Sequence, residues 1–129
     1  MGEKNIHKIF YNKLVRDAIQ EKIEKKGEQC EVRELVDDQE FQQELLKKVV
    51  EEATALSRVR SREEFLSEYA DLMVVLDALT ALMEFSEADV QVALQENVAK
   101  KGLYKKRHFL HWSEDVDYES NETPQGIKE

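Results

Sequence analysis

The chain has 129 residues, of which 36% are charged, and a formal net charge of −9. This length is typical of a single domain that can bury its own core. An acidic surface repels polyanions, so the charge disfavours a broad nucleic-acid-binding face. A small phosphate-bearing ligand stays compatible with it, because local lysines, arginines or a bound metal can reverse the field.

Three features indicate the compartment. The single cysteine, Cys30, cannot form an internal disulfide, which is typical of a reducing environment. The first ten residues lack the apolar run of a signal peptide. The most apolar stretch, residues 69–85, is interrupted by Asp71, Asp77 and Thr80, so it does not read as a membrane span. We therefore expect a cytoplasmic protein with no membrane partner.

The first predicted helix covers residues 11–27. Asn12 is its expected N-cap, apolar residues follow at roughly helical spacing, and Gly27 comes after two lysines as a stop signal. Residues 30–36 then alternate apolar and charged side chains, which favours a short extended segment. A second such segment is expected near residues 105–111, where it could pair with the first.

Three longer helices are predicted between these segments, each with its own start signal. The clearest signal is "SREE", residues 61–64, which matches the Ser-x-x-Glu capping box. Ser86 with Asp89 forms a similar start, and Gly102 follows two lysines as a stop. The three helices are expected to cover about 38–59, 61–85 and 86–102.

The sequence thus predicts an all-α fold, a four-helix bundle in residues 1–112 followed by an acidic tail in residues 113–129. The helix over residues 61–85 is apolar nearly all round from residue 69 onward, and such a helix has to be surrounded. Four helices from one chain are few for that purpose. We therefore expect a homodimer or tetramer.

Glutamates on the helix over residues 38–59 differ in their expected surroundings. At about 100° per residue, Glu52 falls inside the apolar face, whereas Glu51 points to the opposite side and should be solvated. The apolar face itself is formed by Leu45, Leu46, Val49, Ala53 and Leu56.

On the next helix, Glu68 and Asp71 are three residues apart and share a face that continues into Val74, Val75 and Ala78. Carboxylates converging in or near a core need a compensating cation, and oxygen ligands favour Mg²⁺ or Mn²⁺ over Zn²⁺. The alternative is that each acid is simply solvated or paired with a nearby arginine.

These residues resemble a known family. The stretch "VVEEATALSRVRSREEFLSEYADLMVVLDAL" resembles the all-α nucleotide pyrophosphohydrolases of the MazG type, relatives of phosphoribosyl-ATP pyrophosphohydrolase. Their signature, Glu-Glu-x-x-Glu followed by Glu-x-x-Asp, is matched by Glu51, Glu52, Glu68 and Asp71. The motifs "KLVRD" and "KKRHFL" are similar to a subgroup of house-cleaning phosphatases for noncanonical nucleoside triphosphates.

The resemblance implies hydrolysis of a nucleoside triphosphate to monophosphate and pyrophosphate. Glu52, Glu68 and Asp71, with Glu51 as a further candidate, would hold Mg²⁺ or Mn²⁺, which bridges phosphate oxygens and helps activate water. The base of the nucleotide is left open. Substrate-binding candidates are Lys13, Arg16, Asn97, Lys101, Lys105 and Arg107.

One position departs from the family pattern. Ala55 stands where the third glutamate of Glu-Glu-x-x-Glu is expected, which removes a charge and a ligand. One Mg²⁺ could still bind more weakly, whereas a two-metal site would be harder to sustain. The alternative function is therefore a catalytically weakened MazG-like bundle that binds a nucleotide or acts as an assembly scaffold.

Overall fold

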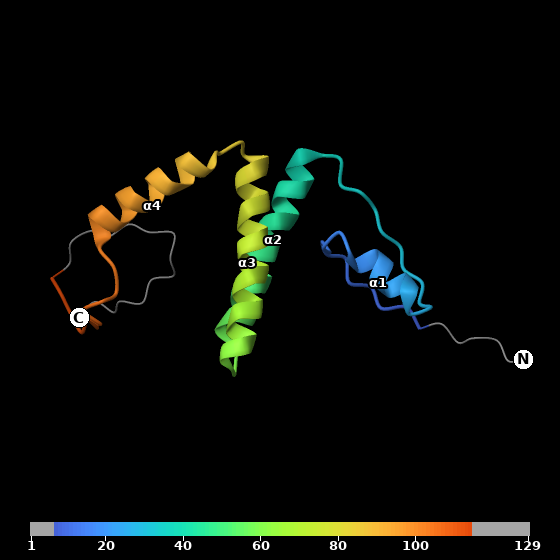
Figure 1. Ribbon diagram of the computed structural model, residues 1–129, viewed down its shortest axis with the longest axis horizontal. Coiled ribbons are helices and arrows are strands. Elements are labelled where there is room, and N and C mark those ends of the chain that lie inside the picture. The colour runs from blue at the N-terminus through green and yellow to red at the C-terminus, as the bar shows by residue number, and fades with distance from the viewer. Residues whose placement is uncertain (1–6, 115–129) are drawn as a thin grey trace, which may run out of the picture. The chain divides into compact units, whose positions relative to one another are not determined.

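The structure is a computed structural model, and it describes residues 7–114. Its four helices are α1 (Ile19–Lys25), α2 (Asp38–Ser57), α3 (Arg62–Leu82) and α4 (Glu87–Lys101) (Figure 1). Residues 7–114 contain no strand. The prediction of an all-α fold is confirmed.

The chain forms two compact units, Met1–Gln91 and Val92–Glu129, and each is described by itself. The first unit carries α1, α2 and α3, and within it the helices that pack together are α2 and α3. Most of the predicted acidic tail lies outside the described residues. The four-helix bundle remains a prediction, since the packing within the first unit is that of a two-helix hairpin.

Local signals in the sequence determine where the hairpin helices begin. At the start of α2, the Asp37 side chain accepts a hydrogen bond from the Gln39 N–H at 3.0 Å. At the start of α3, the Ser61 hydroxyl accepts one from the Glu64 N–H at 3.1 Å. The Glu64 carboxylate accepts from the Arg60 N–H at 2.7 Å, one residue before the position expected for a capping box. Both helix starts are confirmed.

The hairpin is held together by a small apolar core. Leu45 of α2 packs with Val75 and Leu79 of α3, and all three are buried. Five partly buried apolar side chains pack against this core, among them Leu14, which lies before α1. Leu14 therefore attaches the segment that precedes α1 to the α2–α3 hairpin. The other four partly buried side chains are Phe41, Val49, Ala78 and Leu82.

The first helix is much shorter than predicted. It begins at Ile19, and Asn12 has a φ of +48°, a left-handed conformation outside any helix. Residues 12–17 stay irregular while Leu14 among them packs on the core of the hairpin. A tertiary contact thus prevails over helix propensity in this segment, and the prediction for residues 11–18 is wrong.

Neither predicted extended segment forms a strand within residues 7–114. A strand needs a hydrogen-bonded neighbour, and no backbone ladder joins residues 30–36 to another segment of the described chain. Arg33 instead makes a paired contact with Glu40 of α2, at 3.0 Å from each guanidinium nitrogen. Residues 105–111 are also irregular.

Helix α4 follows its predicted signals. The Ser86 N–H donates to the Asp89 carboxylate at 2.9 Å, and the Asp89 N–H donates back to the Ser86 hydroxyl at 3.1 Å. The helix ends before Gly102, whose φ of +79° is the left-handed conformation that glycine adopts most easily.

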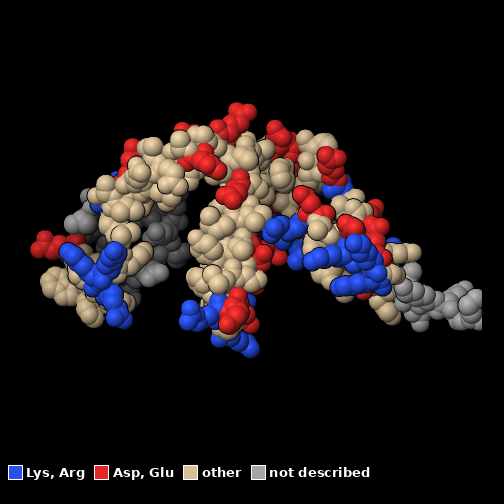
Figure 2. Space-filling view, viewed as in Figure 1, with Lys and Arg blue, Asp and Glu red and all other residues tan. Residues whose placement is uncertain are grey.

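Much of the outer face of α3 is apolar and exposed. Its exposed apolar side chains are Phe65, Leu66, Tyr69, Met73, Val74 and Leu76. Figure 2 shows the visible face of α3 largely free of charged side chains between its two ends. No helix in residues 7–114 combines the length and apolar character needed to cross a membrane.

Candidate functional site

Three carboxylates converge where α2 and α3 pack together. Glu52 comes from α2, and Glu68 and Asp71 come from α3. Each offers one oxygen, and these oxygens all lie within 4.8 Å of one another. All three residues are partly buried. The predicted grouping of Glu52 with the two acids of the next helix is what the geometry of the hairpin produces, and we call these three residues the carboxylate cluster.

The helical repeat explains this convergence. On α3, Glu68 and Asp71 lie on the same face as buried Val75, four residues beyond Asp71, and that face packs on α2. On α2, Glu52 follows core-packed Val49 by three residues. The core of the hairpin therefore holds the three carboxylates in place, as expected for side chains carried by rigid elements.

The surroundings of the carboxylate cluster disfavour the charged form of Glu52. The pKa of Glu52 is raised above the ordinary value of a glutamate, first because burial removes water from the carboxylate and next because Asp71 repels its charge. Lys48 acts in the opposite direction and favours the charged form of Glu52. A cation among the three carboxylates would offset both effects by attracting the charged form of Glu52.

Glu51 has a different environment, as the sequence predicted. It is exposed, and its carboxylate forms ion pairs with two lysines, Lys48 at 3.0 Å and Lys13 at 3.2 Å. Lys13 also donates a hydrogen bond to it. These contacts lower the pKa of Glu51, the hydrogen bond from Lys48 having the largest effect. Glu51 is not a member of the group whose oxygens all lie within 4.8 Å. Its partners in this structure are ammonium groups.

The segment before α1 supplies positive charge to the cluster. Arg16 lies 3.7 Å from the Asp71 carboxylate, measured from Nη1 to Oδ1, and Lys13 reaches Glu51. Between them, Leu14 packs against the core of the hairpin. The motif "KLVRD" therefore places two of the six predicted substrate-binding residues beside the carboxylates.

Lys48 is a site residue that sequence reasoning missed. Its side chain is only 15% exposed, whereas that of the neighbouring Lys47 is 74% exposed. The spacing carried a signal for it, because Lys48 precedes Glu51 by three residues and Glu52 by four, both favourable for contacts on a helix.

The other four predicted substrate-binding residues lie in the second unit. Asn97 and Lys101 are on α4, and Lys105 and Arg107 follow it. All four are exposed, and Arg107 has a left-handed backbone with a φ of +53°. Their participation in a substrate site remains a prediction.

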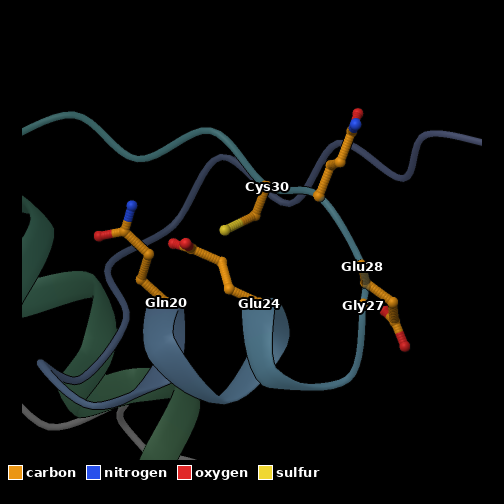
Figure 3. A pocket seen from close by; sticks show the side chains of 6 residues that line it. Gln20, Glu24, Gly27, Glu28 and Cys30 are labelled. Carbon is orange, nitrogen blue, oxygen red and sulfur yellow. The ribbon is translucent and has the colours of Figure 1, made fainter.

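A separate hollow lies beside α1. It is lined by Gln20, Glu24, Gly27, Glu28, Gln29 and Cys30. Figure 3 shows Glu24 and Cys30 pointing toward one another across it, with Gln20 alongside. Cys30 is exposed and has no disulfide partner in the described residues. Its two glutamates and its thiol are all exposed, and they do not make the convergent, charged arrangement found at the carboxylate cluster.

The donor set of the cluster fits a hard divalent cation. Mg²⁺ binds oxygen at about 2.1 Å in an octahedron, so its opposite ligands lie about 4.2 Å apart. The oxygens of the cluster lie within 4.8 Å of one another, a spacing compatible with ligands that share one such ion. Ala55 lies three residues beyond Glu52, is partly buried and offers no ligand atom. Glu52, Glu68 and Asp71 would together supply three oxygen ligands to one such ion.

No protein-family model matches the chain, no curated protein is significantly similar to it, and no solved structure matches it. The resemblance to the MazG type therefore rests on the three sequence motifs.

Proposed function

We propose that this protein hydrolyses a nucleoside triphosphate to a nucleoside monophosphate and pyrophosphate with the help of Mg²⁺. The observation that carries the proposal is the convergence of Glu52, Glu68 and Asp71, whose oxygens lie within 4.8 Å of one another on two packed helices. Further support comes from the MazG-like motifs that contain the same residues. Noncanonical or deoxynucleotides are the substrates suggested by the "KLVRD" motif.

In this proposal the three carboxylates hold one Mg²⁺, with Mn²⁺ as a substitute. When bound, the ion supplies charge neutralisation of the phosphate oxygens and lowers the pKa of a coordinated water. Lys13 and Arg16 bind phosphate oxygens from the segment before α1. A water oxygen attacks the α-phosphorus, the bond to the bridging oxygen breaks, and pyrophosphate leaves.

The active form in this proposal is a homodimer or tetramer in which a second hairpin completes a MazG-like four-helix bundle. Supporting it are the exposed apolar side chains of α3 and of Leu46 and Val50 on α2. The unpaired Cys30 and the acidic composition agree with cytoplasmic residence.

The direct test is a screen for pyrophosphate release. Ordinary and altered nucleoside triphosphates are offered with Mg²⁺ or Mn²⁺ to the wild type, Glu68→Gln and Asp71→Asn. We expect turnover of at least one substrate and its loss by a factor of 100 or so in both variants, which remove charge at a metal ligand. Glu63→Gln, an exposed acid in the first turn of α3, is the matched control and should keep wild-type activity. Turnover that survives both cluster substitutions would disprove the proposal.

A second candidate function follows from Ala55. Without the third glutamate, the hairpin could bind a nucleotide or assemble without turning it over. Thermal stabilisation by nucleotide that does not depend on Mg²⁺, together with no turnover, would favour this candidate. The variant Ala55→Glu separates the two further, because a gain of activity would identify the missing ligand as the defect.

A further inference from the structure

Lys48 is a partly buried cation beside a site that is proposed to bind a polyanion. Its Nζ lies 3.0 Å from Glu51 Oε2, and its charge also acts on Glu52. Holding a lysine side chain at 15% exposure costs free energy from lost hydration and rotamer freedom. Lys47, one position earlier, stays 74% exposed and pairs with Glu44 instead. Lys48 is thus directed toward the carboxylates by the helix itself.

Glu51 holds two ammonium groups at the edge of the cluster. One carboxylate oxygen accepts from Lys13 at 3.2 Å and the other pairs with Lys48 at 3.0 Å. The two lysines come from different segments, one before α1 and one within α2. A carboxylate that bridges two lysines fixes the positions of both, which is what recognition of adjacent phosphate groups requires.

The basic residues beside the carboxylates bring the net charge of the site close to neutral. Four carboxylates gather here, Glu51 together with the cluster, and three cations accompany them, namely Lys13, Arg16 and Lys48. The local charge is therefore close to minus one, and one divalent ion makes it positive. Without the three basic residues, the same ion would leave the site negative and repel a triphosphate.

We propose that Lys48 is a phosphate-binding residue of this site and that Glu51 is its positioning residue. The inference rests on the proposed function and deepens it, since it adds a member to the substrate site that the "KLVRD" and "KKRHFL" motifs do not contain. The ligand class is a metal-bound polyphosphate, recognised through its phosphate groups irrespective of the base. Phosphate oxygens replace Glu51 as the partner of the Lys48 ammonium, and Lys13 binds phosphate while it stays paired with Glu51.

The test measures binding of magnesium tripolyphosphate, a probe without a base, by isothermal titration calorimetry. Lys48→Gln should weaken binding about 10-fold, since a hydrogen bond to a charged group is lost from a partly buried position. Lys47→Gln is the matched control, because it removes the same charge from the adjacent, exposed position, and should change the affinity less than two-fold. Lys48→Arg keeps the charge and should restore most of the binding.

A second readout separates phosphate binding from a structural role. Mn²⁺ binding without phosphate, followed by electron paramagnetic resonance, should become about two- to five-fold tighter in Lys48→Gln, because a cation near the carboxylates is removed. A variant that merely loosened the hairpin would bind both Mn²⁺ and tripolyphosphate more weakly. Glu51→Gln should weaken tripolyphosphate binding less than Lys48→Gln does, because it frees the lysine without removing it.

The outcomes distinguish this inference from the proposed function. Wild-type affinity for tripolyphosphate in Lys48→Gln, with nucleotide turnover intact, would overturn the role of Lys48 and leave the proposed function standing. Suppose that Lys48→Gln binds Mn²⁺ more tightly and tripolyphosphate more weakly, but that the wild type turns over no nucleotide. This result would support the phosphate-binding role of Lys48 and overturn the proposed hydrolase function. Absence of any Mn²⁺ or tripolyphosphate binding to the wild type would overturn both.

Discussion

Arg16 and Asp71 form an ion pair of 3.7 Å between the irregular segment before α1 and the middle of the α2–α3 hairpin. Both side chains are about half exposed, 58% and 44%, so the pair itself contributes little to stability. Its position is set by the apolar contact of Leu14 with the core. The charged groups of the segment are thus positioned by a neighbouring apolar anchor.

Leu14→Ala should release this segment while leaving the hairpin folded. We expect a loss of about 1 kcal/mol in the free energy of unfolding, because a partly buried side chain is truncated. Hydrogen exchange of residues 8–18 should rise by a larger factor than that of α2 and α3. Val15→Ala, at the adjacent exposed position, serves as control. Unchanged exchange in Leu14→Ala would contradict the anchoring role.

The raised pKa of Glu52 predicts a pH-dependent effect of Glu52→Gln in metal-free buffer. A carboxylate with a raised pKa in the folded state binds more protons there than in the unfolded chain, so it lowers stability above that pKa. Glu52→Gln should therefore raise the melting temperature at neutral pH. The gain should shrink as the pH falls toward the ordinary pKa of a glutamate. A gain of equal size at every pH would show that charge is not its cause.

Substitution of the neighbouring Glu51 should change the melting temperature in the opposite direction. Its pKa is lowered by Lys48 and Lys13, so its charged form stabilises the folded chain above the ordinary pKa of a glutamate. Glu51→Gln should lower the melting temperature slightly at neutral pH, and the difference from wild type should vanish in acid as the pH falls through the lowered pKa. A side chain 43% exposed limits the effect to below about 1 kcal/mol.

Mg²⁺ should stabilise the folded chain through the cluster. An ion that binds only the folded state raises the free energy of unfolding by about 1.4 kcal/mol at ten times its dissociation constant. The stabilisation should disappear in Asp71→Asn and persist in Asp77→Asn, which changes an exposed acid on the same helix. Equal stabilisation of both variants by Mg²⁺ would place the ion elsewhere on the chain.

The exposed apolar face of α3 should mediate self-association. Met73→Lys introduces a charge into that face and should reduce the mass measured by light scattering to that of one chain of 15.1 kDa. Leu94→Lys changes an exposed apolar residue on α4 and provides the comparison. A wild type that is already monomeric would contradict the proposed bundle of two hairpins.

The sequence predicted those parts of the fold that local interactions determine. The caps at Asp37, Ser61 and Ser86 depend on side chains within four residues of each helix start, so their patterns could be recognised directly. The different environments of Glu51 and Glu52 also followed from the helical repeat alone. The partners of Glu52 on the neighbouring helix, Glu68 and Asp71, followed once the two successive helices were expected to face each other.

The errors arose where contacts between residues far apart in the sequence determine the local structure. The predicted helix start at Asn12 was wrong because Leu14 packs on the hairpin and the segment around it leaves the helical conformation. Residues 30–36 form no strand in the described chain, and Arg33 there contacts Glu40 of α2. Lys48 was missed because its low exposure of 15% depends on tertiary packing, which the spacing along α2 does not reveal.

The central claim is that Glu52, Glu68 and Asp71 together bind a divalent cation. A crystal grown or soaked with Mn²⁺ and measured for anomalous scattering tests it most directly. We predict a peak within about 2.2 Å of one oxygen from each of the three carboxylates, at the interface of α2 and α3. A well-ordered site in which the three carboxylates remain apart, with no anomalous peak among them, would contradict the account.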